Sequence, residues 1–307
     1  MARPRVLVLG DLVLDVVIAP ARPLEEGTDV PGRVRIRPGG SAANVARGLA
    51  LLGARTSLVC AVGRDGAGRA LVNAAKAEGV TVRAVRVRGA RTGRIGVLVD
   101  ASGERSFVAD RGAADRLAPG DLRPDWFERA DHLHLPAYSL IGEPIGAAGR
   151  RAIEMARAAG ATLSVDLASA GPLLAEGREA AIRLVREARP DFLFGTAREA
   201  EALLDRRDVE SLLDLAPIAV VKRGPEGATI LAVEDDSRLR FEVATERLPA
   251  PDTTGAGDAF DAGFIVGWLA ARESGGSLGV ALHRAAMAGH RAAARHLRSP
   301  RPDLPPG

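Results

Sequence analysis

The stretch Asp252-Thr-Thr-Gly-Ala-Gly-Asp-Ala-Phe-Asp261 is the most informative part of this chain. Its glycines precede an apolar segment, residues 259–271, that we expect to form a helix. Backbone N–H groups at a helix start are unpaired and lie at the positive end of the helix dipole, so they bind anions. The amides of Gly255, Ala256 and Gly257 are therefore candidates for an anion hole, with the carboxylate of Asp258 beside it. An ordinary turn before a helix is the alternative that this stretch alone leaves open.

An anion site beside a carboxylate is the arrangement that phosphoryl transfer needs. Amides hold the charge of the transferring group, and a base accepts the proton of the attacking hydroxyl. Other nucleotide motifs are excluded: neither Lys76 nor Lys222 follows a glycine, as a P-loop requires, and residues 255–260 end in phenylalanine where a dinucleotide fingerprint needs a small residue. The protein-kinase signature is also absent.

The composition is that of a globular protein. The 307 residues are 47% hydrophobic but only 3% aromatic, so the core is built from aliphatic side chains. The net charge of +3 arises without a basic run of the kind that binds nucleic acid. A single cysteine, Cys60, excludes an internal disulfide. Asp11 and Asp15 interrupt the N-terminal apolar run, and no uncharged stretch reaches membrane length. We therefore expect a soluble, cytoplasmic protein without a signal peptide or a membrane partner.

Short apolar runs alternate with alanine-rich helical patterns along most of the chain. The expected buried strands are residues 5–10, 57–62, 132–135, 162–166, 192–194 and 219–222. The expected helices are residues 42–52, 67–78, 144–159, 176–188, 197–204 and 209–213. This alternation predicts an α/β fold with a doubly wound, mainly parallel sheet and helices on both faces.

Two regions, residues 13–37 and 93–110, break this rhythm. Apolar and polar residues alternate there without a helix between them, as in half-exposed antiparallel strands. We expect one small β-sheet, a lid over the ends of the main strands, and its exposed edges suggest a homodimer through the lid. No linker divides residues 1–300, which we interpret as one domain, and residues 301–307 form an irregular tail.

Ligands of an open α/β sheet bind beyond the carboxyl ends of its strands. Asp15 could accept hydrogen bonds from the hydroxyls of a polyol, or it could be a turn residue. Gly39 and Gly40 would let the backbone approach a ligand, Ser41 could cap the following helix, and Asn44 could hydrogen-bond the ligand. A plain helix start is the alternative for this segment.

Two further strand ends carry charged side chains. Asp166 ends residues 162–166 and is either a ligand of the crevice or a salt-bridge partner. Lys222, Gly224 and Gly227 follow another strand, where a basic residue could reach nucleotide phosphates. His132 and His134 share one strand face, but no third metal ligand has a recognisable spacing, so we expect them to be structural.

Separated motifs carry a resemblance to a known family. Residues 252–260, together with Gly39-Gly-Ser-Ala-Ala-Asn44 and Gly63-Arg-Asp-Gly-Ala-Gly68, resemble the two signatures of the ribokinase-like (PfkB) carbohydrate kinases. The match extends from Gly10 to about Ala294, in the family's order and spacing. Two separated motifs in the right order are far more specific than either alone.

The resemblance implies a kinase that uses ATP and Mg²⁺ and a lid that closes over a sugar. It implies that Asp258 is the base and that the amides of Gly255, Ala256 and Gly257 form the anion hole. It places the remaining site residues in two groups: Asp15, Gly39, Gly40, Asn44, Arg111 and Asp166 near the sugar, and Lys222, Gly224 and Gly227 in the nucleotide-side loop.

The chain departs from the family pattern in two places. The family usually has Asn-x-x-Glu where this chain has Thr196-Ala-Arg-Glu199. The resemblance implies that Glu199 organises water-bound Mg²⁺ and that Thr196, on the nucleotide side, weakens this organisation. Asp252 and Thr254 are candidate ligands of a monovalent cation. The glycine-containing loop that contributes to that site in ribokinases is replaced here by residues 296–301. The dependence on a monovalent cation is therefore left open.

The resulting hypothesis is ATP-dependent phosphorylation of a hydroxyl, preferably a primary one, on a small sugar or sugar acid. Arg111 and the Lys222 loop would suit a carboxylate, so a keto-sugar acid such as 2-keto-3-deoxygluconate is a candidate. A nucleoside kinase on the same scaffold is an alternative, although it needs aromatic surface, of which Phe107 is the clearest case in the lid. A non-catalytic sugar-binding homologue is the other alternative.

Overall fold

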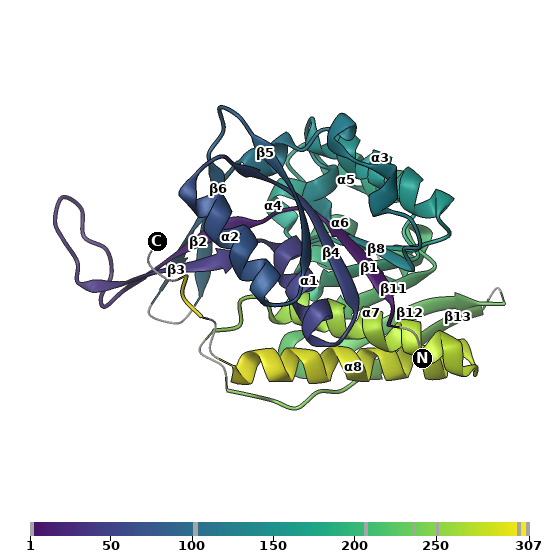
Figure 1. The fold of residues 1–307 in the computed structure, drawn as a ribbon. Helices are drawn as coiled ribbons and strands as arrows, with labels where there is room; N and C mark the ends of the chain where they lie inside the picture. Colours follow the sequence, from purple (N-terminus) through teal and green to yellow (C-terminus); the bar gives the residue numbers. More distant parts are fainter. Residues whose placement is uncertain are drawn as a thin grey trace.

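The computed structural model describes residues 3–100, 104–205, 208–235, 237–249, 252–299 and 302–304, without the side chains of residues 273 and 274. A nine-stranded sheet forms its centre, in the order β13-β12-β11-β10-β9-β8-β1-β4-β5 (Figure 1). The strands are β1 (Arg5–Leu9), β4 (Arg55–Gly63), β5 (Thr81–Val87), β8 (His132–Pro136), β9 (Thr162–Asp166), β10 (Phe192–Thr196), β11 (Ile218–Lys222), β12 (Ala228–Glu234) and β13 (Ser237–Val243). Only β12 runs antiparallel to its neighbours, so the predicted mainly parallel sheet is confirmed.

Helices cover both faces of this sheet, as predicted. One face packs against α1 (Ser41–Leu51), α2 (Gly66–Ala77), α7 (Ala256–Ser274) and α8 (Leu278–Arg298). The other packs against α3 (Ile145–Ala158), α4 (Ala170–Leu173), α5 (Arg178–Ala188) and α6 (Ala197–Leu204). Because side chains alternate along a strand, a central strand contributes to the hydrophobic cores on both faces of the sheet. In β10, Phe192 and Phe194 pack in the core on the side of α7, and Leu193 packs in the core on the side of α3.

Six short 3₁₀ helices complete the described elements: η1 (Ala113–Arg116), η2 (Pro119–Asp121), η3 (Pro124–Trp126), η4 (Ala137–Leu140), η5 (Val209–Asp214) and η6 (Gly224–Glu226). The helix predicted at residues 209–213 is therefore a 3₁₀ helix. The sequence pattern did not predict β5, β12 and β13. In the edge strands β5 and β13, arginines such as Arg83 and Arg238 interrupt the apolar runs. No described helix is long and apolar enough to cross a membrane.

The lid is a separate four-stranded sheet in the order β3-β2-β6-β7. Its strands are β2 (Val13–Pro20), β3 (Gly32–Gly39), β6 (Thr92–Val99) and β7 (Arg105–Gly112), so the sheet predicted from two separate regions is confirmed. The expected antiparallel pairing holds for β2 with β3 and for β6 with β7, whereas β2 and β6 pair in parallel. Figure 1 shows β2 and β3 extending away from the main body.

The two faces of the lid differ in character. Directly paired residues share a face, and the pairs Ile18↔Val34 and Gly96↔Val108 lie on the outer one. Ile18, Val34, Ile36 and Val108 are exposed there. The opposite, inner face carries Asp15, Arg37, Arg105 and Phe107.

The described part of the tail, residues 302–304, runs beside the lid without regular structure. The amide of Leu304 donates to the carbonyl of Ile36 in β3 at 2.8 Å, and Asp303 pairs with Arg37 at 3.2 Å. The predicted irregular tail also includes residues that lie outside the described ranges, namely 301 and 305–307.

Candidate active site

The first turn of α7 begins earlier than the sequence pattern predicts. Gly255, in a left-handed conformation (φ 82°), is the N-cap, and the helix starts at Ala256 rather than at residue 259. The amide of Ala256 donates to the carbonyl of Thr253 at 3.1 Å, so it closes the turn. Among the described residues, no acceptor pairs with the amides of Gly255 and Gly257. Two of the three predicted anion-hole amides are therefore available to a ligand.

Asp258, the predicted base, is held by two neutral donors from the start of α1. The hydroxyl of Ser41 and the side-chain amide of Asn44 each donate to one carboxylate oxygen, both at 2.8 Å. Burial raises the pKa of Asp258 to about 6, although these two hydrogen bonds act in the opposite direction. A carboxylate with such a pKa is ionised at neutral pH and still basic enough to accept a proton.

Ser41 does not cap α1, contrary to expectation. The N-cap is Gly40, without a side-chain cap, and Ser41 is the first helical residue. Its hydroxyl is directed instead to Asp258, more than two hundred residues along the chain. A local sequence pattern cannot distinguish these two uses of a serine, because the second depends on where α7 packs.

Gly39 and Gly40 allow two carboxylate-bearing segments to approach the backbone. A Cβ atom on Gly39 would lie 2.0 Å from Oδ1 of Asp15, and one on Gly40 would lie 2.5 Å from the carbonyl oxygen of Asp11. Gly40 also has a φ of 101°, which disfavours any other residue. The structure thus brings Asp15 on the lid next to the glycines before α1.

Asp11 is a site residue that the sequence analysis did not propose. One of its oxygens accepts from the amide of Ala42 at 3.1 Å, so it holds the first turn of α1. Its other oxygen lies 3.5 Å from the guanidinium of Arg111.

Arg111, predicted to lie near the sugar, is engaged by the protein itself. Its Nε donates to Asp115 at 2.8 Å, and its guanidinium lies over the ring of Tyr138, 4.4 Å from the centroid. These contacts, together with Asp11, fix the guanidinium and leave it less able to bind a substrate carboxylate.

Lys222 and Asp166 form a buried ion cluster with a third residue, Asp261. The ammonium of Lys222 lies 2.8 Å from Asp166 and 3.0 Å from Asp261. Burial opposes charge on every member, but Lys222 keeps the pKa of Asp166 below its usual range. Burial raises the pKa of Asp261 well above its usual range, because one ammonium cannot offset two buried carboxylates.

Within the ion cluster, Asp166 and Lys222 have different partners from those that the motif implies. Asp166 is a salt-bridge partner, which was the alternative left open, and the ammonium of Lys222 is directed to carboxylates. The cluster nevertheless adjoins the anion site, because a Cβ atom on Gly257 would lie 3.5 Å from Nζ of Lys222. The sequence analysis did not identify Asp261, one turn after Gly257, as a site residue, because its position is that of an ordinary helix residue.

Thr196 and Glu199 form a reciprocal cap at the start of α6. The amide of Thr196 donates to Oε2 of Glu199 at 2.7 Å, and the amide of Glu199 donates to the hydroxyl of Thr196 at 3.2 Å. Burial, and next the charge of Asp166, raise the pKa of Glu199. Threonine in place of asparagine therefore serves here as a helix cap.

Three of the four predicted nucleotide-side residues line one cavity. Thr196, Lys222 and Gly224 border a space of about 710 Å³ between α6 and the β11–β12 turn. Gly227 forms that turn with a φ of 97°, and a Cβ atom there would lie 2.2 Å from the carbonyl oxygen of Val243. Its role is therefore steric.

The donor set fits Mg²⁺ held mostly by water and phosphate. Within the described ranges there is no cluster of three or more His, Cys, Asp or Glu side chains that could hold a metal ion. Mg²⁺ characteristically keeps several waters and uses one or two carboxylates together with substrate phosphates, so Glu199 alone is compatible with this mode.

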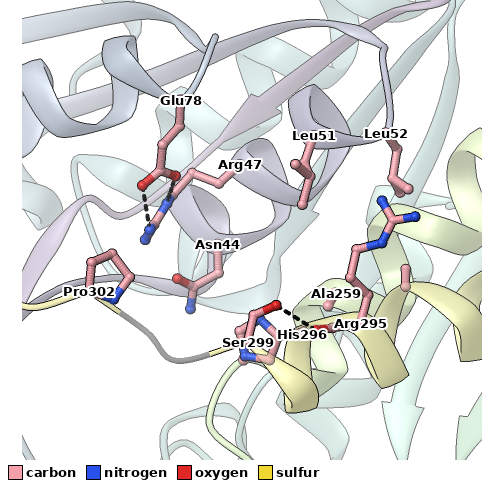
Figure 2. A pocket seen from close by; sticks show the side chains of 13 residues that line it. Asn44, Arg47, Leu51, Leu52, Glu78, Ala259, Arg295, His296, Ser299 and Pro302 are labelled. Atoms are coloured by element: carbon pink, nitrogen blue, oxygen red, sulfur yellow. Dashed lines mark hydrogen bonds and ion pairs between the residues drawn. The ribbon is translucent and has the colours of Figure 1, made fainter.

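The candidate ligands of a monovalent cation are occupied by protein groups. Arg37 and Arg105 donate to the two carboxylate oxygens of Asp252 at 2.8 and 2.9 Å. The carbonyl of Thr254 accepts from Nε2 of His296 at 2.8 Å. His296 also borders a cavity of about 310 Å³, across which Asn44 of α1 faces His296 of α8 and Ser299, the residue that follows α8 (Figure 2).

His132 and His134 lie buried in β8, and both hydrogen-bond to the hydroxyl of Ser164, at 2.7 and 2.8 Å. Burial lowers the pKa of His132 to about 3 and that of His134 to about 4. They are therefore neutral core residues, in agreement with the structural role expected.

Comparisons with known proteins place this chain in a family. The profile of the pfkB family carbohydrate kinases matches residues 3–303. A fructokinase from Solanum tuberosum is 32% identical over 263 residues, with 82% of this chain and 76% of the relative covered. An ATP-dependent ribose-1-phosphate kinase from Halopiger xanaduensis is 34% identical, with 86% of this chain and 85% of the relative covered.

A solved structure shows the same fold. The adenosine kinase from Sinorhizobium meliloti superposes with a TM-score of 0.81 at 26% identity, covering 98% of this chain and 96% of the other. These findings confirm the ribokinase-like fold and the enzyme class predicted from the motifs, an ATP-dependent carbohydrate kinase. The chain belongs to the pfkB family of carbohydrate kinases.

Proposed function

We propose that the protein transfers the γ-phosphoryl group of ATP to a hydroxyl of a small sugar or sugar acid, with a primary hydroxyl as the favoured acceptor. The observation that carries this proposal is the setting of Asp258. Its partly buried carboxylate is oriented by Ser41 and Asn44, and Gly257, whose amide is available, immediately precedes it in the chain. A base and an anion site are thus held together by one helix start.

In this mechanism Asp258 accepts the proton of the acceptor hydroxyl as the hydroxyl attacks. The amides of Gly255 and Gly257 donate to the phosphoryl oxygens, where negative charge accumulates. Bound Mg²⁺ would neutralise phosphate charge, with Glu199 as the residue that orients its waters. The ion cluster of Lys222, Asp166 and Asp261 supports α7, through its second turn, from the side of β11.

The substrate binds between the lid and the start of α1. Asp15 on the inner face of the lid and the backbone at Gly39 and Gly40 are the groups that contact its hydroxyls, and Asn44 orients Asp258 as well as the substrate. Closure of the lid over this space excludes water, which protects ATP from hydrolysis.

A nucleoside is the second candidate substrate. Phe107 lies on the inner face of the lid with 59% of its surface exposed, and such an aromatic ring can stack on a base. The similarity to a solved adenosine kinase supports the same alternative. Conversely, the contacts of Arg111 with Asp115 and Asp11 weaken the case for an acidic sugar.

The test is release of ADP with ATP and Mg²⁺ against a panel of acceptors. The panel holds ribose, fructose, ribose 1-phosphate, 2-keto-3-deoxygluconate, adenosine, inosine and pseudouridine, with Asp258→Asn as the control. Turnover of a sugar that the variant loses supports the proposal. Turnover of nucleosides alone selects the second candidate. ATP binding without turnover of any acceptor would instead favour a non-catalytic binding protein.

We further propose a homodimer through the outer face of the lid. The exposed apolar side chains of Ile18, Val34, Ile36 and Val108 support it, because a second lid would cover them. Sedimentation of the wild type and of Val34→Glu is the test, and a monomeric wild type contradicts the proposal. The single-domain organisation and the cytoplasmic location stay predictions.

A further inference from the structure

The turn before α7, residues Asp252 to Gly255, is held from three directions. Within the turn, the amide of Thr254 donates to Asp252 at 3.0 Å. Outside it, Arg37 and Arg105 bind the carboxylate of Asp252, and His296 binds the carbonyl of Thr254. This turn ends at Gly255, so whatever fixes it also fixes the amides that would hold the phosphoryl group.

The two arginines come from opposite edges of the lid. Arg37 lies on β3 and Arg105 on β7, which are the two edge strands of the four-stranded sheet. Their side chains are only 9% and 13% exposed, so their charges lie close to Asp252 with little solvent between them. Arg105 also donates to the hydroxyl of Thr253 at 3.1 Å. The lid is therefore joined directly to the anion-hole turn.

His296 completes the arrangement from α8. Its Nε2 donates to the carbonyl of Thr254, and a Cβ atom on Gly255 would lie 3.2 Å from the same nitrogen. A carboxylate and a backbone carbonyl at this position are oxygen ligands of the kind that an alkali cation requires. In this chain each of these oxygens already accepts a hydrogen bond from a cationic or imidazole side chain.

We propose that Arg37, Arg105 and His296 are positioning residues that hold the anion-hole turn in place of a monovalent cation, so that the activity does not depend on K⁺ or Na⁺. The inference rests on the proposed function for its kinetic part. A guanidinium is a fixed, permanently charged group, so it supplies the positive charge without an equilibrium with the solvent. An alkali cation at this point would also be repelled by two guanidinium groups.

The arrangement links the position of the lid to the geometry of the anion hole. In this position of the lid, the charges of Arg37 and Arg105 already contact Asp252 and order the turn. Loss of these contacts should therefore lower kcat more than it raises the KM for the acceptor, since the phosphoryl group is held by amides that the turn positions.

The experiment compares potassium, sodium and choline chloride at equal ionic strength of about 100 mM, so that general screening is constant. The variants are Arg37→Ala/Arg105→Ala, the conservative Arg105→Lys, and Arg33→Ala as a control for loss of an exposed arginine from the same strand. The readouts are kcat, KM and the thermal unfolding temperature. The unfolding temperature does not depend on activity, so a failure of the proposed function is distinguishable from a failure of this inference.

For the wild type and Arg33→Ala, we expect rates that differ by less than about twofold between the salts. The double variant should lose kcat by on the order of 10- to 100-fold, and K⁺ but not choline should restore part of the activity and raise its unfolding temperature. Arg105→Lys should keep most of the activity.

Two results would overturn the inference. The first is a wild type that K⁺ activates or stabilises specifically over choline. The second is a double variant that keeps the wild-type kcat, or that K⁺ neither reactivates nor stabilises.

Discussion

Two carboxylates in the first turns of α7 have opposite surroundings, although they are three residues apart. Asp258 is bound by a hydroxyl and an amide from α1, which are neutral. Asp261 lies against the ammonium of Lys222 and the carboxylate of Asp166. Asp261 is buried and Asp258 is partly buried, and burial is the main cause that raises the pKa of each.

The difference shows how neighbours assign roles to identical side chains. Neutral donors orient Asp258 without quenching its basicity, so it remains a proton acceptor. The ammonium of Lys222 instead satisfies two carboxylates at once, and Asp166 in particular is kept ionised as an ion-pair partner. In the proposed mechanism Asp258 therefore carries the chemistry, and Asp261, one turn further along α7, holds the helix in place.

The largest expected effect is the loss of turnover on changing Asp258. Asp258→Asn keeps the shape but removes the base, so kcat should fall by about two to four orders of magnitude. Asp261→Asn is the matched control, since an amide resembles the protonated carboxyl that its raised pKa favours. Steady-state ADP release measures both. Equal losses in the two variants would contradict the division of roles.

Removal of Lys222 tests the supporting side. Lys222→Met leaves the buried carboxylate of Asp166 without a cation, so the free energy of unfolding should decrease by about 3–5 kcal/mol. Lys76→Met, at an exposed position near the end of α2, controls for loss of a lysine. Urea unfolding of both variants measures the difference, and a Lys222 variant as stable as the control would refute the cluster's structural role.

Asp258 should also destabilise the fold above pH 6. Its pKa is raised from 3.8 to about 6 on folding, so the folded state binds more protons, and stability falls as the pH rises between these values. Asp258→Asn should therefore increase the free energy of unfolding above pH 6 by up to about 3 kcal/mol. The gain should shrink on acidification to about pH 4. Unfolding curves at the two pH values measure it, and a gain independent of pH would contradict this explanation.

The smallest expected effect concerns the donors to Asp258. The hydrogen bond from Ser41 stabilises the ionised carboxylate and lowers its pKa, so Ser41→Ala should raise the pKa of Asp258 further. The acidic limb of the kcat/KM profile should move to higher pH, while Ser106→Ala on the outer face of the lid should leave it in place. A profile of the Ser41 variant that coincides with the wild type would exclude Asp258 as the titrating group.

The motif of the proposed active site was predictable because its signals are local. A glycine in a left-handed turn and an apolar helix after it locate the anion site, and Asp258 lies in the first turn whichever residue begins the helix. The same holds for Gly39 and Gly40, whose lack of a side chain has a steric reason. The parts that were missed, such as Asp11, Asp261 and His296, look like ordinary loop or helix residues until their partners are known.

The sequence by itself therefore determined the alternation of strands and helices, the lid segments and the helix start that carries Asp258, because periodicity and backbone sterics act over a few residues. Only the tertiary structure decided which charges meet. Arg37 reaches Asp252, Lys222 joins Asp166 with Asp261, and His296 binds Thr254 across long separations in the chain. Electrostatic partners depend on distance and burial in three dimensions, and neither quantity can be predicted from the local sequence.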